Sequence, residues 1–395
     1  MPGPLKGIRV LDMTWALAGP FCAMLLCDLG AEVIKVENPE GGDPSRRNFP
    51  FIEGISSYFL SVNRGKKSIT VNLQHPRGKE IILGLVKKSD VMVENFRPGV
   101  LDRLGLGYAA VREVNPKIIY AACSGFGQKS PYAHRPAYDV IVQGMGGTLS
   151  ITGEAGGPPV RVGFSIGDLG GGIFTALGIL SALQERERSG MGQMVDVSML
   201  DCQMALLENA FARFFATGEV AQRIGSRHPV LTPFQALPTK DGYIVVAVPR
   251  EDWWQKFCHL INRQDLLADE RFKDNPSRTK NHKELEAILS VVTRTRTTAE
   301  WVADMEKIDV ACGPVNTIDQ VAQDPHTIAR EMITGVQHSK AGMLRVVNSP
   351  IKLSRTPVKL EKACPEVGEH TNEILRSLLG LSEEEVAGLR SEKAI

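Results

Sequence analysis

Two residues that could act as nucleophiles lie close together in a glycine-rich segment of this 395-residue chain. Ser165 stands in Gly163-Phe164-Ser165-Ile166-Gly167, which matches the G-x-S-x-G pattern of a hydrolase nucleophile elbow. Asp168 follows directly, and the glycines 170–172 come soon after it. A carboxylate at a helix start is stabilised by exposed N–H groups and the helix dipole, and it can form a covalent bond to an acyl group.

Both residues also have ordinary structural interpretations. Asp is a favoured N-cap residue, and a helix is predicted to begin at Asp168, so this side chain could simply cap that helix. Ser165 could be a turn residue, because no HGGG-type oxyanion segment precedes it and Gly156-Gly157-Pro158-Pro159 interrupts the strand expected before an elbow. From these residues alone, a carboxylate nucleophile, a serine nucleophile and a helix cap all stay open.

The first predicted strand-to-helix turn lacks the glycines of a dinucleotide site. Leu17-Ala18-Gly19-Pro20 stands there in place of G-x-G-x-x-G, and Pro20 has no N–H to offer a pyrophosphate. Glu37 does lie where a Rossmann site would place its ribose-binding acid. Without the glycines, we interpret the turn as structural and expect neither NAD nor FAD.

Basic residues follow several predicted strands. Ligands of open α/β sheets bind at the carboxyl ends of the strands, so these cations would suit a phosphorylated cofactor of modest size. They are Arg46, Arg47, Lys66, Lys67, Arg97, Arg103 and Arg135.

Alternating strands and helices predict an α/β fold with a mostly parallel sheet. Apolar residues 169, 173, 176, 180 and 183 are spaced to share one face of a helix. A strand at 242–248 and charged helices from 252 to 307 predict a second domain. Further strands are expected at 8–13, 32–37, 68–73, 90–94, 117–122 and 194–197, and further helices at 20–30, 76–88, 99–115 and 199–215.

Composition narrows the possible functions. The length predicts about two domains of ~150 residues. With 46 Lys+Arg against 45 Asp+Glu, the net charge of +1 gives little support for nucleic-acid binding. The longest apolar stretch, 173–183, is shorter than the ~20 residues of a membrane span, and the N-terminus resembles no leader. Seven scattered cysteines and eight dispersed histidines predict a reducing, cytoplasmic location and no metal site.

Taken together, longer segments resemble the class III CoA-transferases, a group that includes formyl-CoA and carnitine CoA-transferases and the related α-methylacyl-CoA racemases. The resemblance covers nearly the whole chain. The segments are Val10-Leu11-Asp12, Ala18-Gly19-Pro20, Leu29-Gly30-Ala31-Glu32-Val33-Ile34-Lys35-Val36-Glu37, Asn63-Arg64-Gly65-Lys66-Lys67-Ser68, Val93-Glu94-Asn95-Phe96-Arg97-Pro98-Gly99, Gly125-Phe126-Gly127, Gly167-Asp168, Gly313-Pro314-Val315 and Gly368-Glu369-His370-Thr371.

The resemblance implies a large Rossmann-like CoA-binding domain (1–200), a linker helix (201–224), a small α+β domain (225–329) and a C-terminal return to the large domain (330–395). It also implies an interlocked homodimer. Asp168 matches the family's nucleophile, which forms an aspartyl-acyl anhydride and then an aspartyl-CoA thioester. The N–H groups of Gly170 to Gly172 are candidate donors to the oxyanion.

By the same resemblance, coenzyme A, held as an acyl-CoA substrate, would contact residues in several segments. Formyl-CoA transferases carry Gln where Leu17 stands and a cation where Asn38 stands, which argues against oxalate and formate as substrates. The implied contacts are Leu17, Ala18, Asn38, Leu73, Gln74, Asn95, Phe96, Arg97, Arg103, Pro136, Ala137 and Tyr138.

A racemase is the main alternative. The acid-base His of that branch is replaced, since the chain reads Arg135-Pro136-Ala137-Tyr138-Asp139, and a Tyr with a pKa of ~10 is a poor base. The chain looks most similar to the succinyl-CoA-using dicarboxylate branch, so we expect transfer of CoA to a small carboxylic or dicarboxylic acid. A serine hydrolase using Ser165 and a non-catalytic CoA-binding module are weaker alternatives.

Overall fold

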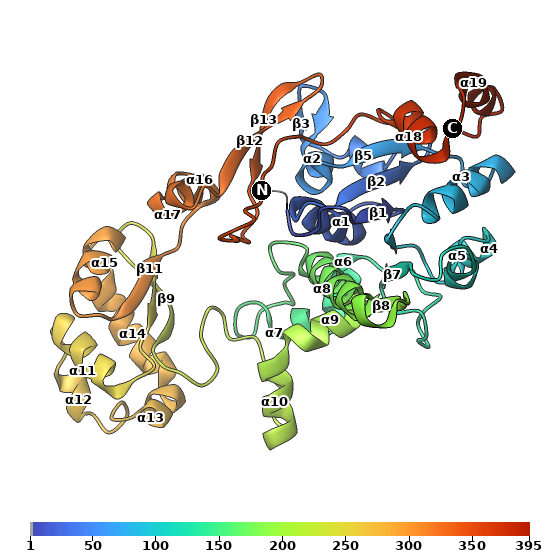
Figure 1. Ribbon diagram of the computed structural model, residues 1–395. Coiled ribbons are helices and arrows are strands. Elements are labelled where there is room, and N and C mark those ends of the chain that lie inside the picture. Colours follow the sequence, from blue (N-terminus) through green and yellow to red (C-terminus); the bar gives the residue numbers. More distant parts are fainter. Residues whose placement is uncertain (1–2) are drawn as a thin grey trace. The chain divides into compact units, whose positions relative to one another are not determined.

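A computed structural model describes residues 3–395, and the chain forms two compact units. The first contains residues up to Thr148, Arg161–Gly218 and Pro325–Ile395, and the second contains Leu149–Val160 and Glu219–Asp324. Figure 1 draws both units and labels most of their elements. Helix α7 (Thr148–Ile151) lies at the first change of unit.

A six-stranded parallel sheet forms the centre of the first unit, in the order β5-β2-β1-β6-β7-β8. The chain therefore proceeds in one direction from β1 to β2 and β5, and in the other from β6 to β8. Loops after β1 and β6 diverge at this switch point, where open α/β sheets bind ligands. The strands are β1 (Arg9–Asp12), β2 (Glu32–Glu37), β5 (Lys67–Thr70), β6 (Val91–Glu94), β7 (Ile119–Ser124) and β8 (Met194–Ser198).

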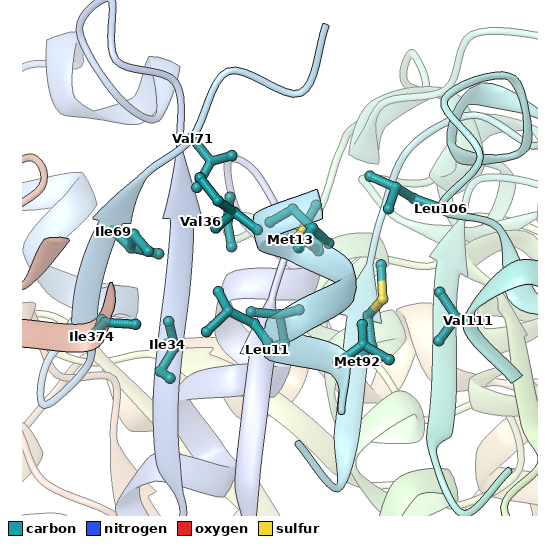
Figure 2. Close-up of a cluster of buried hydrophobic side chains, with 14 of the residues drawn as sticks. Leu11, Met13, Ile34, Val36, Ile69, Val71, Met92, Leu106, Val111 and Ile374 are labelled. Carbon is teal, nitrogen blue, oxygen red and sulfur yellow. The ribbon is translucent and has the colours of Figure 1, made fainter. Parts of the chain in front are cut away.

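All six strands were predicted from the sequence to within a few residues. Strands of a parallel sheet are buried on both faces and have strongly apolar sequences, so they can be recognised from the sequence. Leu11 pairs with Ile34 on one side and Met92 on the other. Figure 2 shows these side chains in one buried cluster, with Met13, Val36 and Val71 gathered at the next level along the strands.

Helices cover the sheet of the first unit, and two short hairpins accompany it (Figure 1). The helices are α1 (Ala18–Asp28), α2 (Ser57–Asn63), α3 (Pro76–Val86), α4 (Val100–Arg103), α5 (Tyr108–Val114), α6 (Asp139–Met145), α8 (Ile166–Ser189), α9 (Met199–Leu206), α10 (Glu208–Thr217), α17 (Pro325–Ala329), α18 (Thr371–Leu379) and α19 (Glu383–Ser391), with the 3₁₀ turn η1 (Pro44–Arg47). The hairpins pair β3 (Phe51–Ile52) with β4 (Ile55–Ser56) and β12 (Ile333–His338) with β13 (Gly342–Val347).

Two predicted helices are each divided in the structure. The helix expected at 99–115 becomes α4 and α5, because Gly105 between them has a φ of +67° that interrupts the helix. The helix expected at 199–215 becomes α9 and α10, which are separated by Leu207 at φ −93° and ψ 31°. Sequence periodicity continued across both interruptions and therefore concealed them.

The predicted helix after Asp168 is α8, but its buried face differs from the expected one. Large Ile173 and Leu177 are more than half exposed, whereas Thr175, Ala176 and Ile179 are buried. Small residues face inward because α1 packs closely against this helix. By length and composition α8 could cross a membrane, yet half of its apolar stretch is buried against its own unit, as is typical of a core helix.

The second unit has a three-stranded antiparallel sheet, in the order β11-β10-β9, with helices around it. Trp254, Phe257, Phe272 and Trp301 fill its core, and the buried Arg278 pairs with Glu251. This unit is the expected α+β arrangement. Its elements are β9 (Phe234–Pro238), β10 (Tyr243–Ala247), β11 (Ala311–Pro314), α11 (Glu251–Leu260), α12 (Asp265–Ala268), α13 (Asn275–Lys280), α14 (His282–Thr293), α15 (Thr298–Lys307) and α16 (Ile318–Gln323).

Candidate active site

Asp168 lies in the first turn of α8, but it does not cap that helix. The helix begins at Ile166, and Ser165 holds the N-cap position without a side-chain capping bond. The N-cap interpretation of Asp168 is therefore wrong by three residues. Within residues 3–395, the Asp168 carboxylate has no hydrogen-bond partner, although the positive end of the helix dipole is beside it.

Burial raises the pKa of the Asp168 carboxyl to about 7, and the negative charge of Asp139 adds to the effect. Most carboxyl groups near a protein surface titrate around pH 4. A raised pKa with no hydrogen bond means that the carboxylate is poorly stabilised, and such a group gains by sharing its charge with an electrophile. Asp168 thus has the electrostatic character of a nucleophile at neutral pH.

Asp139, at the start of α6, fixes the backbone just before Asp168. Its Oδ1 accepts the N–H of Gly167 at 2.8 Å, and its Oδ2 accepts the Nε2 amide of Gln143 at 2.7 Å. Gln143 in turn accepts the N–H of Val162 at 3.0 Å, and Arg161 lies 3.6 Å from Asp139. The buried carboxylate therefore connects α6 to both ends of the segment that leads into α8.

The glycines around Asp168 permit close packing. A Cβ on Gly167 would lie 2.6 Å from Val142 Cγ2, and one on Gly172 would lie 2.7 Å from the carbonyl oxygen of Ala18. Gly170 packs closely against α9, and Gly171 packs closely against both α9 and β7. Because positions 170–172 lie within α8, their N–H groups belong to the intrahelical ladder, so the expectation that they donate to an oxyanion is not supported.

Tyr58 on α2 is a candidate site residue that sequence analysis missed. Burial raises the pKa of its phenol to about 12, and the charge of Asp168 is the next cause. The hydroxyl is therefore a stable proton donor in the electrostatic range of Asp168. No short pattern marked this tyrosine, because it approaches Asp168 only through the packing of the unit.

A cleft of about 850 Å³ opens at the carboxyl edge of the sheet. It is bordered by the loops after β1, β2, β5 and β6 and by part of the C-terminal segment, as the switch-point rule predicts. Its lining residues are Met13, Trp15, Val36, Glu37, Asn38, Pro39, Glu40, Val71, Asn72, Leu73, Gln74, Phe96, Val100, Arg103, Leu104, Arg390, Lys393 and Ile395.

The structure brings some of the sequence-predicted cofactor residues together in this cleft: Asn38, Leu73, Gln74, Phe96 and Arg103. The other predicted contacts lie outside its lining. Leu17 and Ala18 lie at the start of α1, and the exposed Arg97 follows β6. Pro136, Ala137 and Tyr138 form the loop that leads to Asp139, near the start of α8.

The basic residues that were predicted to share one binding site lie in different places. Arg46 binds Glu37, Lys66 is buried against Asp12, and Lys67 pairs with Glu32 and Glu373. Arg135 lies over the ring of Tyr132, while Arg47 is exposed and lines no described cavity with the others. Arg103 is the residue of this predicted group that lines the cleft.

The loop after β1 runs from the cleft to α8. Asn95 holds Trp15 by two hydrogen bonds of 2.8 Å, one from the N–H of Trp15 and one to its carbonyl oxygen. The ring of Trp15 meets Phe96 edge-on at 5.1 Å. Ala18, three residues later, packs against Gly172 of α8. The loop therefore joins the wall of the cleft to the helix that carries Asp168.

Buried ion pairs support that loop from below. Lys66 Nζ lies 2.8 Å from Asp12 Oδ2 and also donates to the carbonyl oxygen of Pro20 at 3.0 Å. Lys35 Nζ lies 2.9 Å from Asp43 and donates to the carbonyl oxygen of Thr14 at 2.8 Å. Buried charges are tolerated only when paired, so these two lysines impose one conformation on residues 12–20.

Ser165 lacks the surroundings of a hydrolase nucleophile. Its hydroxyl forms no hydrogen bond with any residue in 3–395, so no histidine or other base is placed to activate it. The elbow pattern is therefore a coincidence of a turn before α8.

Comparison with known proteins identifies the family of this chain. A family model described as CoA-transferase family III matches residues 5–371. The chain is 37% identical to a succinate–glutarate CoA-transferase of Agrobacterium fabrum, covering 95% of this chain and 96% of the relative. It is 42% identical to an acetyl-CoA:oxalate CoA-transferase of Acetobacter aceti, covering 89% and 90%. A CAIB/BAIF family protein from Brucella suis has the same fold, with a TM-score of 0.86 and 37% identity over 96% of this chain and 100% of that one.

Proposed function

The chain belongs to CoA-transferase family III, and on that basis we propose that it moves CoA from succinyl-CoA to a small dicarboxylic acid with Asp168 as the nucleophile. The observation that carries the proposal is the Asp168 carboxylate, which has a pKa raised to about 7 by burial and Asp139 and no hydrogen-bond partner in residues 3–395. Buried carboxylates with a structural role accept hydrogen bonds from their neighbours, whereas the half-buried Asp168 carboxylate accepts none in residues 3–395.

The reaction proceeds through covalent intermediates. An oxygen of Asp168 attacks the thioester carbonyl, the C–S bond breaks, and CoA leaves as a thiolate while an aspartyl-succinyl anhydride forms. The thiolate then attacks the Asp168 carbonyl of the anhydride, which releases succinate and leaves an aspartyl-CoA thioester. The acceptor carboxylate displaces CoA to form a second anhydride. Finally the thiolate attacks the acceptor carbonyl, which frees Asp168 and the new acyl-CoA.

This sequence needs only groups that the substrates and the chain supply. One carboxylate and one thioester are exchanged for another pair of nearly equal energy. The protein must therefore keep water from the anhydride and stabilise each oxyanion. The Tyr58 hydroxyl, which burial and Asp168 keep protonated with a pKa of about 12, is a candidate donor for that purpose.

Coenzyme A fits the unit if its nucleotide end occupies the cleft and its pantetheine arm follows the loop from Trp15 to Ala18. The cleft volume of about 850 Å³ is large enough for a ligand of this size. Asn38, Leu73, Gln74, Phe96 and Arg103 then contact the nucleotide end. Leu17, Ala18, Asn95, Arg97 and residues 136–138 lie along the path to Asp168 or beside it.

The relatives are named for glutarate and for oxalate, so their names favour a dicarboxylic acceptor. Leu17 is an apolar, half-buried residue at the start of α1, near the packing contact with α8. An apolar side chain there suits an acceptor with methylene groups between its carboxylates better than oxalate.

The proposal is tested by incubating the protein with succinyl-CoA and a panel of carboxylic acids and following new acyl-CoA masses by chromatography and mass spectrometry. We expect a new acyl-CoA with the wild type and none with Asp168→Ala. Failure of every acid, or full activity of the alanine variant, would reject the nucleophile. Exchange of α-protons without any second acid would instead support the racemase alternative.

We also propose that two chains form an interlocked homodimer through the face made by α8 and α10. Ile173 and Leu177 on α8 and Phe214 and Phe215 on α10 are 45% to 77% exposed, and α10 has no buried residue. Monomeric proteins rarely expose apolar surface of this kind. Light scattering should give twice the mass of one chain, and Phe215→Asp should shift it to the monomer. The seven free cysteines suit a cytoplasmic location.

A further inference from the structure

One wall of the cleft comes from the C-terminal segment 389–395, which is hundreds of residues from the other walls in sequence. The N–H of Asn72 donates to the carbonyl oxygen of Ala394 at 2.8 Å, and its Nδ2 donates to that of Lys393 at 3.3 Å. Ala394 and Ile395 are buried in the main core of the first unit. The segment is therefore a fixed part of the cleft that no motif predicted.

Three cations line the cleft without a carboxylate at ion-pair distance in residues 3–395, two of them from the C-terminal segment and one from α4. Arg103, Arg390 and Lys393 line the cleft and are exposed. In residues 3–395 none of them forms an ion pair with a carboxylate, and Arg390 has one hydrogen bond to Asn372 at 2.9 Å. By contrast, Glu37 in the same cleft is already neutralised by Arg46.

We propose that Arg103, Arg390 and Lys393 bind the 3′-phosphate of coenzyme A, an inference that rests on the CoA-transferase function proposed above. A phosphate monoester carries nearly two negative charges at neutral pH, more than either phosphate of the diphosphate bridge. Arg presents a planar fork to phosphate oxygens and Lys a mobile point charge, so the two residue types bind such a dianion well. Glu40, which follows β2, also lines the cleft.

This arrangement makes the C-terminal segment a specificity element. A thioester of 3′-dephospho-CoA or of pantetheine alone would leave the three cations unpaired, whereas the full coenzyme satisfies them. The enzyme should therefore select CoA thioesters by the charge of their 3′-phosphate, which is distant from the reacting carbonyl. Because the phosphate does not change during the reaction, this binding should lower KM and leave kcat unchanged.

The test compares succinyl-CoA with succinyl-3′-dephospho-CoA for the wild type and for Lys393→Gln and Arg390→Gln. We expect the wild type to show a KM at least roughly 10-fold lower for succinyl-CoA, the factor that one or two charge-assisted hydrogen bonds provide. Each variant should raise the KM for succinyl-CoA and leave the KM for the dephospho form and both kcat values unchanged. Lys87→Gln, an exposed lysine at the end of α3 outside the cleft, is the matched control and should behave as wild type.

Five outcomes are distinguishable. Loss of discrimination in the variants alone supports the inference. Equal KM values for the two thioesters in the wild type, or equal losses on both in the variants, overturn it, because the cations would then bind the diphosphate or nothing. In the wild type, the KM for succinyl-CoA should rise with ionic strength, whereas the KM for the dephospho form should not. A KM for succinyl-CoA that does not depend on salt would also count against the inference. Absence of any transfer activity in the wild type would reject the proposed function itself.

Discussion

The side chain of Asp139 holds the backbone N–H of Gly167, one residue before Asp168, at 2.8 Å. This bond joins α6 to the first turn of α8 and places one carboxylate near another. The same Asp139 that fixes the position of Asp168 also raises its pKa, after the larger effect of burial. Asp139 therefore contributes both to the position of the proposed nucleophile and, after burial, to its raised pKa.

The pH dependence of the reaction should report this arrangement. Only the ionised form of Asp168 can attack, and burial together with Asp139 raises its pKa to about 7. We expect kcat/KM to fall about tenfold per pH unit below that value and to level off above it. Asp139→Asn removes a negative charge and keeps an oxygen acceptor, so its acidic limb should move to lower pH. An unchanged limb in the variant would show that another group controls the profile.

Ionisation of the same carboxyl group, which activity requires, should lower the stability of the folded protein. The raised pKa means that the folded state resists ionisation, so the penalty is absent below the usual pKa of 3.8, grows as the pH rises, and is complete above about 7. Asp168→Asn should therefore raise the Tm more at pH 8 than at pH 4.5, by roughly a few degrees. Thermal unfolding of both proteins at both pH values measures the difference, and equal shifts at the two pH values would contradict it.

Replacement of Gly167 by Ala should reduce activity far more than replacement of Gly163. The new Cβ would lie 2.6 Å from Val142 Cγ2 and 3.0 Å from Asp139 Oδ1, whereas a Cβ on Gly163 meets nothing within 4 Å. We expect Gly167→Ala to cost about 1 to 3 kcal/mol in stability and to lower kcat roughly 100-fold through misplacement of Asp168. Gly163→Ala should match the wild type in both. Similar behaviour of the two variants would contradict the proposed positioning.

Loss of Lys66 should destabilise the protein strongly. Its Nζ pairs with the buried Asp12 at 2.8 Å, and neither side chain is exposed. Lys66→Met would leave a buried carboxylate without its counter-charge, at a cost of about 3 to 5 kcal/mol. Lys273→Met removes a solvent-exposed pair with Glu270 and should change little. Urea unfolding of both variants gives the comparison, and a small effect at Lys66 would show that Lys35, the second cation acting on Asp12, or solvent compensates for the lost charge.

Ser165→Ala should keep the wild-type rate of CoA transfer, because the hydroxyl has no base beside it in the described chain. The same assay with a fluorophosphonate probe should show no labelling of Ser165. Labelling, or loss of activity in the variant, would restore the hydrolase alternative.

The sequence alone determined the parts of the protein whose cause is local. The apolar strands of the parallel sheet, among them β2 at Glu32–Glu37, follow from composition and period, because a strand buried on both faces must be apolar throughout. The residues around Asp168 favoured a helix cap and left a nucleophile open, and the family resemblance then favoured the nucleophile. None of this required knowledge of which segments meet in space.

Only the tertiary structure decided how distant residues act on one another. Asp139 is 28 residues from Gly167, and Asn72 is 321 residues from Lys393, yet each pair is joined by a hydrogen bond. The exposed side of α8 was likewise set by close packing of its small residues against α1, and not by its apolar period. Periodicity reports what one element buries, whereas a site is made where the ends of several elements converge. The physical reason is that burial, charge coupling and shape at such a point depend on all the neighbours at once.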